Sequence, residues 1–363
     1  MDRKRFILAI NPYYTYTKIG IFNEKGKLIL LNKIPFAHNS IKKYYNQKDF
    51  RVGDIMAFLK SCGLSLGEFK SIVGIGGLLR PMPGGTYKIT PKILEDLRIG
   101  YGGEHISNLG ALIAYDIGNK ANVQSFIVDS MTVDEMYKEA RVTGLPNVQR
   151  TALSYVLSMK YSASIICEKI DKSLKSSSFI IAQLGEDIST IALKNGKLVD
   201  MNNFYDEGTF SLHGCGAIPP LKLAKLAFQY KGDYRTFSTE LFSKGGLMDY
   251  MNTEDIDQVY NNLSAEEACS GKYANIVESL SYNIAKDIGA MAAVLNFKVD
   301  RIILTGSLSS NHKIVSEIEK RVEFISPVEI LEGTFEMEAM IAGVLRVLKD
   351  EEPVKIYENE VQL

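Results

Sequence analysis

Residues 6–22 decide the fold, and their sequence is Phe6-Ile-Leu-Ala-Ile-Asn-Pro-Tyr-Tyr-Thr-Tyr-Thr-Lys-Ile-Gly-Ile-Phe22. An apolar strand leads into a short polar turn at 11–18, and a second apolar strand follows. A hairpin of this shape is typical of phosphate-binding loops, in which backbone N–H groups and small hydroxyl side chains surround an anion. Three bulky rings, Tyr13, Tyr14 and Tyr16, stand where such a turn would carry glycine and serine.

A second copy of this pattern begins near the middle of the chain. Phe6-Ile-Leu-Ala9 recurs as Phe179-Ile-Ile-Ala182, and a strand at 189–193 follows it. The tight turn Lys25-Gly26-Lys27-Leu28 recurs as Asn195-Gly196-Lys197-Leu198. Each copy predicts a strand, a polar turn, a second strand, a glycine-bearing turn and a third strand. The distance between the copies is close to half of the 363 residues, which indicates a duplicated lobe.

Apolar strands alternate with helical patterns after each copy, which predicts α/β lobes with mixed sheets. The expected strands are 71–74, 125–128 and 301–304, and the expected helices are 149–173, 272–295 and 337–349. The polar tail from Asp350 is expected to fray. Two duplicated lobes with a cleft between them are a kinase or ATPase architecture. The predicted lobes are 1–148 with 340–363, and 149–339.

Composition narrows the class of protein. The length predicts two or three domains at roughly one domain per 150 residues. The chain has 42 basic and 43 acidic residues, so a nucleic-acid partner is not expected. Four scattered cysteines, at positions 62, 167, 215 and 269, form no CxxC pair, and only four histidines occur. There is no apolar signal segment or membrane span, which predicts a soluble cytoplasmic protein without membrane partners.

Several longer motifs, in the same order, resemble the butyrate kinases of the acetokinase family, within the actin/sugar-kinase/Hsp70 superfamily. The motifs are Val73–Tyr87, His105–Gly110, 127–129 with 133–136, 141–146, 244–247, 288–295, 304–306 and 321–325. The resemblance covers about Phe6 to Leu348. It implies two actin-like (ribonuclease H-like) lobes with a cleft. It also implies the reaction ATP + butanoate ⇌ ADP + butanoyl phosphate with Mg²⁺.

The resemblance also implies a set of site residues. The positions that it places at the nucleotide are Asn11, Thr15, Thr17, Lys18, Gly185, Thr305, Gly306 and Ser307. It places Asp129 and Glu336 in the catalytic and metal-binding site. From the residues alone, Asp129 could instead cap a following helix. Arg80, within the Val73–Tyr87 motif, could be a surface charge.

Both phosphate loops depart from the family pattern. The first loop has Tyr13, Tyr14 and Tyr16 where the family has Gly, Ser and Ser. The second loop, His-Met-Gly-Gly-Gly in the family, is Gln183-Leu-Gly-Glu-Asp187 here. Each new carboxylate at ~5 Å from a phosphate charge would cost on the order of 3 kcal/mol at an effective dielectric near 20. A bound Mg²⁺ could convert that repulsion into ligation.

The cationic groups that the family uses are also replaced. Ile75 and Gly214 stand where the family has arginines, and Tyr155 stands where it has a histidine. Losing one such arginine typically costs ~10³–10⁵ in rate. His213 could partly replace the charge missing at position 214, and Lys160 persists.

Three functions follow as hypotheses. The first is a carboxylate kinase that acts on a small carboxylate with ATP and Mg²⁺, but is catalytically impaired. The second is an inactive paralogue that serves as a regulatory or binding subunit of an active acyl kinase, as a homodimer or a heteromer. The third is a module that binds a small carboxylate without nucleotide.

Overall fold

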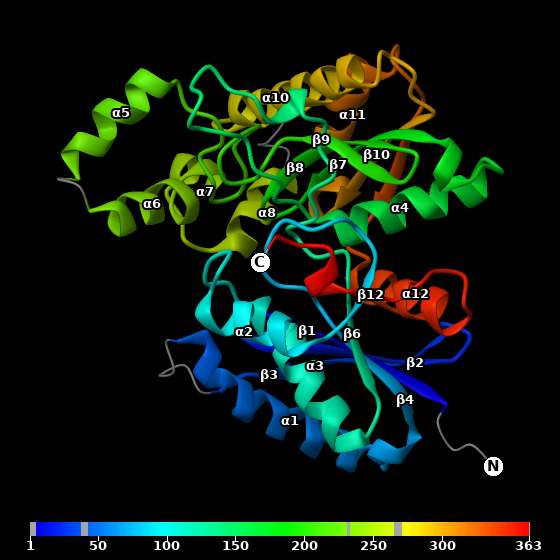
Figure 1. Cartoon of the computed structure of the whole chain (residues 1–363). Coiled ribbons are helices and arrows are strands. Elements are labelled where there is room, and N and C mark those ends of the chain that lie inside the picture. The colour runs from blue at the N-terminus through cyan, green and yellow to red at the C-terminus, as the bar shows by residue number, and fades with distance from the viewer. Residues whose placement is uncertain (1–4, 38–42, 231–232, 265–270, 363) are drawn as a thin grey trace. The chain divides into compact units, whose positions relative to one another are not determined.

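The computed structural model describes residues 5–37, 43–230, 233–264 and 271–362. They form two compact units (Figure 1). The first unit comprises Met1–Asp134, Val156–Tyr161 and Phe335–Leu363, and the second comprises Glu135–Tyr155 and Ser162–Thr334. Cys269, one of the scattered cysteines, lies outside the described residues.

The first unit is built on a seven-stranded mixed sheet with the order β12-β5-β6-β4-β1-β2-β3. β1 pairs antiparallel with β2, and it pairs parallel with β4 on its other side. The strands are β1 (Phe6–Pro12), β2 (Tyr16–Asn23), β3 (Leu28–Pro35), β4 (Phe69–Gly74), β5 (Thr86–Lys88), β6 (Gln124–Val128) and β12 (Lys355–Ile356). The helices are α1 (Lys48–Ser61), α2 (Pro91–Ile99), α3 (Asn108–Ala121) and α12 (Glu336–Leu348).

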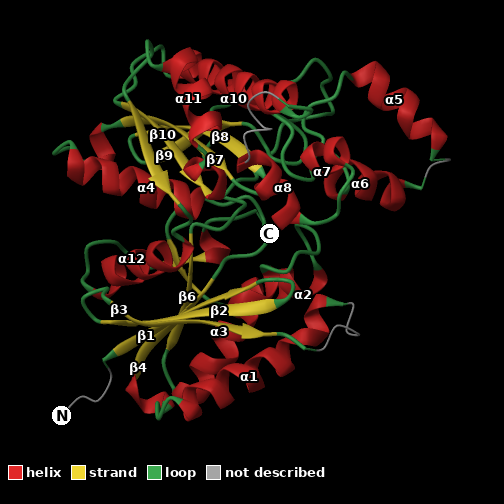
Figure 2. Ribbon diagram, turned by 180° about the vertical axis from the view of Figure 1, so that it is seen from behind, coloured by secondary structure: helices red, strands yellow, loops and turns green. Residues whose placement is uncertain are grey.

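Alternation along β1 gives this sheet two apolar faces. Leu8 and Ile10 join the core under α1, α2 and α3, whereas Ile7 and Ala9 join the core under α12. Successive side chains of a strand point to opposite faces, so a continuous apolar strand is buried on both sides. Figure 2 shows α1 and α3 on one side of the sheet and α12 on the other.

The C-terminal tail is ordered in the first unit, so the expectation that it frays was wrong. β12 pairs parallel with β5, and Tyr357 is fully buried. The Tyr357 hydroxyl donates to Asp96 at 3.0 Å and accepts the Arg80 N–H at 2.9 Å. Arg80 is therefore no isolated surface charge, because its guanidinium also pairs with the buried Asp96 at 2.7 Å.

The second unit repeats the same strand pattern in a five-stranded sheet with the order β11-β10-β7-β8-β9. β7 is antiparallel to β8 and parallel to β10, just as β1 is to β2 and β4. Thus β9-β8-β7-β10-β11 corresponds to β3-β2-β1-β4-β6, and the duplication predicted from the sequence is confirmed. The strands are β7 (Ser178–Leu184), β8 (Ile188–Lys194), β9 (Lys197–Met201), β10 (Arg301–Gly306) and β11 (Val328–Glu332).

The predicted tight turns are present in both copies. Gly26 and Gly196 each have φ of +78°. In the second copy Asn195 and Gly196, both at positive φ, connect Lys194 directly to Lys197. An Asn-Gly pair is favoured in such two-residue hairpins because both positions need positive φ.

Two long helices cover one face of the second sheet. α10 (Ala274–Val294) and α11 (His312–Val322) pack with alternate residues of β7 and β10 in one apolar core. The remaining helices of this unit are α5 (Pro220–Gln229), α6 (Tyr234–Ser243), α7 (Gly246–Met251) and α8 (Ile256–Ser264). α4 (Val156–Lys169) is shorter than the helix expected at 149–173 and contributes residues to both units.

The segment 135–155 contacts β9 of the second unit. The Tyr137 N–H donates to Val199 O at 2.9 Å, and Glu135 accepts the Leu198 N–H at 3.1 Å. The lobe limits drawn from the sequence stay a prediction, because contact-based units are not by themselves independently folding domains.

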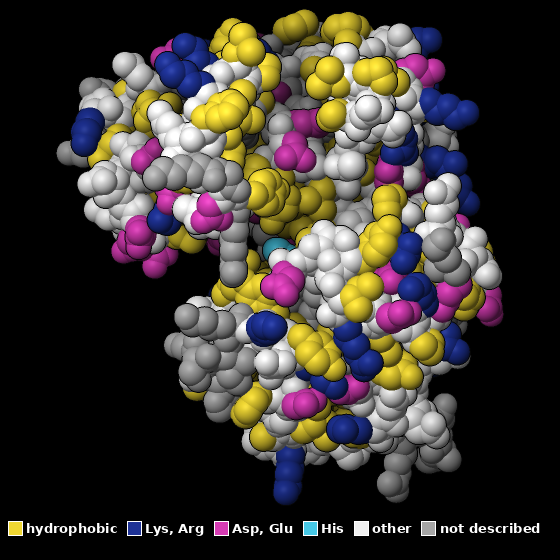
Figure 3. Space-filling view, turned by 60° about the vertical axis from the view of Figure 1, so that its left-hand side comes forward, with side chains coloured by type: hydrophobic (Ala, Val, Ile, Leu, Met, Phe, Trp, Pro, Cys, Tyr) yellow, Lys and Arg dark blue, Asp and Glu magenta, His cyan; other side chains and the backbone are white. Residues whose placement is uncertain are grey.

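Among the described residues no helix is long and apolar enough to cross a membrane. Basic and acidic side chains are interspersed over the face in Figure 3.

Candidate functional site: two altered phosphate loops

The turn between β1 and β2 is filled by aromatic rings. Tyr13 and Tyr16 stack with ring centroids 4.6 Å apart, and the Tyr13 N–H closes the turn on Tyr16 O at 2.8 Å. The buried Asn11 amide donates to the Tyr13 hydroxyl at 3.3 Å. Tyr14 is 57% exposed, and its ring contacts those of Tyr44 and His105 edge-on. A residue expected at the nucleotide, Asn11, is thus bonded to one of the rings that replace the glycine and serines.

A buried arginine on α1 lies against the backbone of this turn. The Arg51 guanidinium donates to the carbonyl oxygens of Tyr13 at 2.9 Å, Tyr14 at 3.3 Å and Tyr16 at 3.0 Å. It also donates to the Thr17 hydroxyl at 2.8 Å. Arg51 is 1% exposed. The turn therefore directs its carbonyl groups at a cation within its own unit.

The other contacts of Arg51 are also to uncharged groups. Gln47 Oε1 accepts from Nε at 3.2 Å and from Nη2 at 2.9 Å, and the guanidinium lies over the Phe36 ring at 4.1 Å. Burial lowers the pKa of Arg51 to about 10, with a partial opposing effect of Asp54. The group is still positively charged at neutral pH, so its hydrogen bonds are charge-assisted.

The other predicted residues of the first loop occupy different environments. Thr17 is 3% exposed, and its hydroxyl is used by Arg51. Thr15 lies in the exposed part of the turn, and its carbonyl accepts the Phe36 N–H at 2.8 Å. Lys18 follows on β2 opposite Asn11. The structure thus keeps all four predicted residues in one hairpin, with the Thr17 hydroxyl facing the arginine.

Asp129 follows β6 in a strained and buried position. Its φ is +38°, which is uncommon for a residue other than glycine, and it is 7% exposed. Its Oδ1 accepts the Gly85 N–H at 2.9 Å and lies 3.4 Å from Lys160 Nζ on α4. A Cβ at Gly84 would lie 2.1 Å from Lys160 Nζ, so this glycine makes room for the ion pair. Residues 130–138 form no helix, and the helix-cap alternative for Asp129 was wrong.

Two further positions of the first unit that the sequence analysis singled out are Glu336, which is half-buried, and Ile75, which is buried. Glu336 begins α12, and its Oε2 is buried with no hydrogen-bond partner among the described residues. An unpaired carboxylate oxygen fits a cation ligand. Ile75, in a family arginine position, is 9% exposed and packs in the core under α12.

In the turn between β7 and β8, the Asp187 carboxylate contacts other side chains of the same unit. Asp187 Oδ2 accepts the Tyr155 hydroxyl at 2.7 Å, and Oδ1 lies 3.6 Å from His213 Nε2. The Gly185 N–H closes the turn on Asp187 O at 3.2 Å. Burial, followed by the nearby Asp187 charge, raises the pKa of Tyr155 well above its usual value. Burial also raises the pKa of Glu186, which His213 partly opposes.

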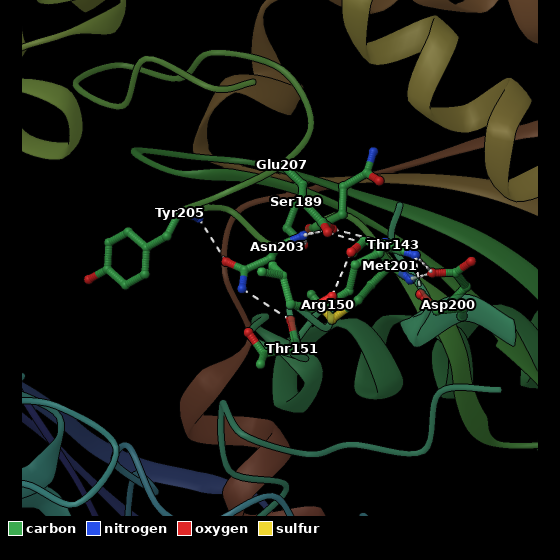
Figure 4. Close-up of polar contacts among 12 residues, drawn as sticks. Thr143, Arg150, Thr151, Ser189, Asp200, Met201, Asn203, Tyr205 and Glu207 are labelled. Carbon is green, nitrogen blue, oxygen red and sulfur yellow. Dashed lines mark hydrogen bonds and ion pairs between the residues drawn. The ribbon is translucent and has the colours of Figure 1, made fainter. Parts of the chain in front are cut away.

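Neighbouring loops hold Tyr155 in place. Its ring stacks on Phe204 at 5.1 Å. The loop that carries Phe204 is fixed by Arg150, which pairs with Glu207 at 2.6 Å and with Asp200 at 2.9 Å. Figure 4 shows Arg150 between these two carboxylates and among backbone carbonyl groups. A network of charged hydrogen bonds thus fixes the loop that packs on Tyr155, the residue that the sequence analysis predicts at a histidine position of the family.

The Gly214 position forms a tight local turn. The Ser211 N–H donates to Gly214 O at 2.9 Å, and the Gly214 N–H donates to Ser211 Oγ at 3.0 Å. A Cβ at this glycine would lie 2.9 Å from Ser211 Oγ, so an arginine here would require Ser211 to move. The next residue back, His213, is directed at Asp187 as described.

The predicted nucleotide turn at 305–307 is also present. Thr305 is fully buried, and its hydroxyl donates to Gly333 O at 3.3 Å. Gly306 has φ of +100°, and a Cβ would lie 2.3 Å from Leu184 O, so only glycine fits. Ser307 Oγ hydrogen-bonds to the Tyr260 hydroxyl of α8 at 2.7 Å.

Sequence reasoning missed three residues at these loops. Arg51 could have been suspected, because Arg51, Ile55 and Leu59 form an i, i+4, i+8 stripe that is otherwise apolar. No comparable local signal marked Tyr260 or Phe204, whose contacts join segments distant in sequence.

The residues of these two turns do not suit nucleotide phosphates in the way that the family pattern would. The first turn carries stacked rings, and the second carries two acids, one of them bonded to Tyr155. No group of three or more His, Cys, Asp or Glu side chains among the described residues could hold a metal ion. The unpaired oxygen of Glu336 fits a cation, and Mg²⁺ commonly uses one or two carboxylates plus substrate phosphates.

Comparison with known proteins matches this geometry to one class. The duplicated sheet pattern with a turn between the first two strands of each copy defines an actin-like kinase fold. Residues 153–331 match the acetokinase family. The chain is 38% identical over 357 residues to butyrate kinase 2 of Clostridium acetobutylicum, covering 97% of this chain and 99% of the relative. It is 35% identical over 358 residues to a probable butyrate kinase of Thermotoga petrophila, covering 98% and 99%.

The chain therefore belongs to the acetokinase family, with butyrate kinases as its relatives. The same fold occurs in the solved acetate kinase of Porphyromonas gingivalis, with a TM-score of 0.77 at 17% identity, covering 95% of this chain and 100% of that one. A propionate kinase from Francisella tularensis has a TM-score of 0.74 at 15% identity, covering 93% and 98%. Kinases of this family use ATP, generally with Mg²⁺.

Proposed function

We propose that this chain is a carboxylate kinase of the butyrate kinase type whose phosphoryl transfer is impaired by its own side chains. The observation that carries the proposal is the hydrogen bond from the Tyr155 hydroxyl to Asp187 Oδ2 at 2.7 Å. Tyr155 occupies the position of the family histidine, and Asp187 occupies a glycine position of the second phosphate loop. The Asp187 carboxylate thus accepts the hydrogen bond that a phosphate oxygen would need to accept at this position.

Electrostatics support the same conclusion. A phosphate brought within ~5 Å of Asp187 would cost on the order of 3 kcal/mol at an effective dielectric near 20. His213, at 3.6 Å from Asp187, is the nearest candidate to offset that charge. Burial raises the pKa of Glu186, so its charge is easier to neutralise than that of an exposed glutamate.

The first loop supports the proposal by a steric route. The stacked rings of Tyr13 and Tyr16 occupy the turn, and Asn11 is bonded to the Tyr13 hydroxyl. A glycine at position 13 would remove both the ring and this hydrogen bond. Ile75 is part of the apolar core, so position 75 supplies no cation for a phosphate.

Loss of cations matters because phosphoryl transfer depends on their position and charge. The two replaced arginine positions, 75 and 214, would each cost ~10³–10⁵ in rate if they act independently. We propose Asp129 and Glu336 as the remaining acids of the metal-binding site, with Lys160 beside Asp129.

A second candidate function is a non-catalytic subunit that pairs with an intact acyl kinase or with itself. The specific observation in its favour is that two substituted residues, Tyr155 and Asp187, bond to each other, and that the substituted Tyr13 accepts a hydrogen bond from the retained Asn11. Substitutions that bond to each other preserve the fold without preserving phosphate binding. A cytoplasmic location and a dimeric state remain predictions for either function.

The first experiment measures nucleotide binding and turnover by the unmodified chain. Thermal unfolding is followed with and without Mg-ATP, since a ligand at 100 times its Kd raises stability by about 2.7 kcal/mol. Hydroxamate formation from butanoate and ATP measures acyl phosphate. We expect no measurable thermal shift and hydroxamate formation that is much slower than that of an intact relative, whereas turnover at the rate of an intact relative would contradict the proposal.

Restored variants identify which loop is the obstacle. Tyr13→Gly with Tyr14→Ser and Tyr16→Ser clears the first turn, and Tyr155→His with Glu186→Gly and Asp187→Gly clears the second. The matched control is Tyr282→Ser, an exposed tyrosine of α10. We expect a Mg-ATP-dependent thermal shift only when both loops are cleared. Co-purification with an intact relative, in the absence of any shift, would favour the subunit function.

A further inference from the structure

Arg51 has contacts that set it apart from the other charged residues of its unit. Its guanidinium is almost fully buried, and its hydrogen-bond acceptors among the described residues are uncharged. Three of the acceptors are backbone carbonyls of one turn, contributed by Tyr13, Tyr14 and Tyr16. By contrast, the buried Asp96 of the same unit has ion-pair partners in Arg80 and Lys92.

Contacts to carbonyl oxygens do not depend on the side chains of the turn. The carbonyls of residues 13, 14 and 16 would be available whether those residues were tyrosine, serine or glycine. A planar guanidinium presents five donors in a fixed arrangement, so it can hold several carbonyls at once. The shape of the turn can therefore persist when its side chains change.

We propose that Arg51 is the positioning residue of the first phosphate loop, which it holds in one backbone conformation through the carbonyls of residues 13, 14 and 16. This inference rests on the proposed function in one respect, namely that the β1–β2 turn is that loop. It predicts that the tyrosines fill the loop without reshaping it. Clearing the rings should then reveal a loop that is already formed.

Gln47 supports Arg51 from the opposite side. Its Oε1 accepts from both Nε and Nη2, which directs the remaining donors toward the turn. The Phe36 ring covers the guanidinium face, and the Phe36 N–H binds Thr15 O of the same turn. Arg51 on α1 is thus contacted by Gln47 of η1 (Tyr44–Gln47) and by Phe36, which follows β3.

Hydrogen exchange in the unmodified loop tests this directly. The Arg51→Lys substitution keeps the positive charge, but a lysine ammonium cannot bridge three carbonyl oxygens and a hydroxyl. We expect amide exchange in residues 13–17 to become about ten-fold faster in this variant, with unchanged exchange in β4 and β6. Tyr357→Phe is the matched control, because it removes buried hydrogen bonds elsewhere in the unit and should leave 13–17 unchanged.

A milder variant keeps the test decisive if the lysine substitution prevents folding. Gln47→Met removes the acceptor behind Arg51 without touching the turn, and should accelerate exchange in 13–17 by about three-fold. Unchanged exchange at 13–17 in a folded Arg51→Lys or Gln47→Met protein would overturn the proposal. Uniformly faster exchange throughout the unit would also overturn it, since that result indicates a general structural role.

Binding in the restored protein separates this inference from the proposed function. In a protein with both loops cleared, Arg51→Lys should raise the Kd for Mg-ATP about ten-fold, or ~1.4 kcal/mol, while Tyr357→Phe should not. If the cleared protein does not bind ATP even with Arg51 intact, the explanation by side-chain obstruction fails. The exchange result still decides the role of Arg51 in that case.

Discussion

The two hairpin turns have the same strand pairing but differ in charge: the first contacts a cation, and the second carries two acids. The β1–β2 turn holds the cation of Arg51 on its carbonyls, and its side chains are uncharged rings. The β7–β8 turn carries the acids Glu186 and Asp187, and its closest contact is a hydroxyl hydrogen bond from Tyr155. The strand order and pairing around both turns are nevertheless the same.

This difference separates the shape of a phosphate loop from its chemistry. The first turn is fixed through its backbone, so side-chain changes at 13, 14 and 16 can be accepted without altering the hairpin. The second turn is fixed through a side chain, because Asp187 bonds to Tyr155 and lies near His213. Substitutions in the first turn should therefore act on binding, whereas substitutions in the second should act on both binding and stability.

The largest effect is expected from removal of the cation behind the first turn. Arg51→Met would leave the partly buried carbonyl oxygens of Tyr13 and Tyr14 and the Thr17 hydroxyl without this donor, while Tyr16 O would keep the Tyr13 N–H. Each unsatisfied buried group costs about 1–3 kcal/mol, so we expect a loss of about 3–5 kcal/mol in the free energy of unfolding. Urea denaturation, with the m-value checked for two-state behaviour, measures it.

Arg5→Met is the control for that substitution. Arg5 is paired with Glu68 at 2.8 Å, but its side chain is 65% exposed. Exposed pairs contribute about 0–1 kcal/mol, so the control should change stability little. A loss below 1 kcal/mol for Arg51→Met would show that the first turn does not depend on its cation.

One buried aspartate of the second unit should make stability depend on pH. Burial raises the pKa of Asp287 on α10 to about 6, while Asn202, the Thr209 N–H and Lys286 lower it and Glu207 raises it further. Because the folded pKa is above the unfolded value of 3.8, the folded state binds more protons between pH ~4 and ~6. Stability from this group is present at low pH and is lost as pH rises through 6.

Asp287→Asn removes that titration. We expect the variant to match the natural chain near pH 4 and to exceed it by up to about 3 kcal/mol at pH 7. The control substitution is Asp257→Asn, at an exposed aspartate of α8. A constant difference between Asp287→Asn and the natural chain from pH 4 to 7 would contradict the assigned pKa.

The fold could be predicted from the sequence because its signals are local. Strand alternation, the Gly26 and Gly196 turns and the i, i+4 stripe of α10 each depend on residues close in sequence. The C-terminal tail could not be predicted this way. Its two-residue β12 and the buried Tyr357 are stabilised by partners about 260 residues away, such as Asp96.

The site could be predicted only as a set of positions. The family pattern indicated that Tyr155 and Asp187 replace a histidine and a glycine, but nothing in either motif indicated that they bond to each other. The same holds for Asp129 and Lys160, which lie 31 residues apart in sequence and form an ion pair beside Gly84. Pairing of replaced residues is a tertiary property, and a single sequence contains no record of it.

A smaller effect is expected from the hydroxyl of the second turn. Tyr155→Phe keeps the ring on Phe204 but leaves Asp187 without its donor at 2.7 Å. A hydrogen bond to a charged group contributes about 1.5–3 kcal/mol, and partial exposure of Asp187 reduces this to about 1–2 kcal/mol. Thermal and urea unfolding measure the loss, with Tyr282→Phe as the exposed control. Equal stability of Tyr155→Phe and the natural chain would remove the distinction between the two turns.

The smallest effect is expected from the matching hydroxyl of the first turn. Tyr13→Phe removes the acceptor of the Asn11 amide, but that contact is long, at 3.3 Å, and the stacked ring on Tyr16 remains. We expect a loss of about 0.5 kcal/mol, measured beside Tyr45→Phe as an exposed control. A loss larger than that of Tyr155→Phe would reverse the comparison, because the first turn would then depend on its side chains and not on the carbonyls that Arg51 holds.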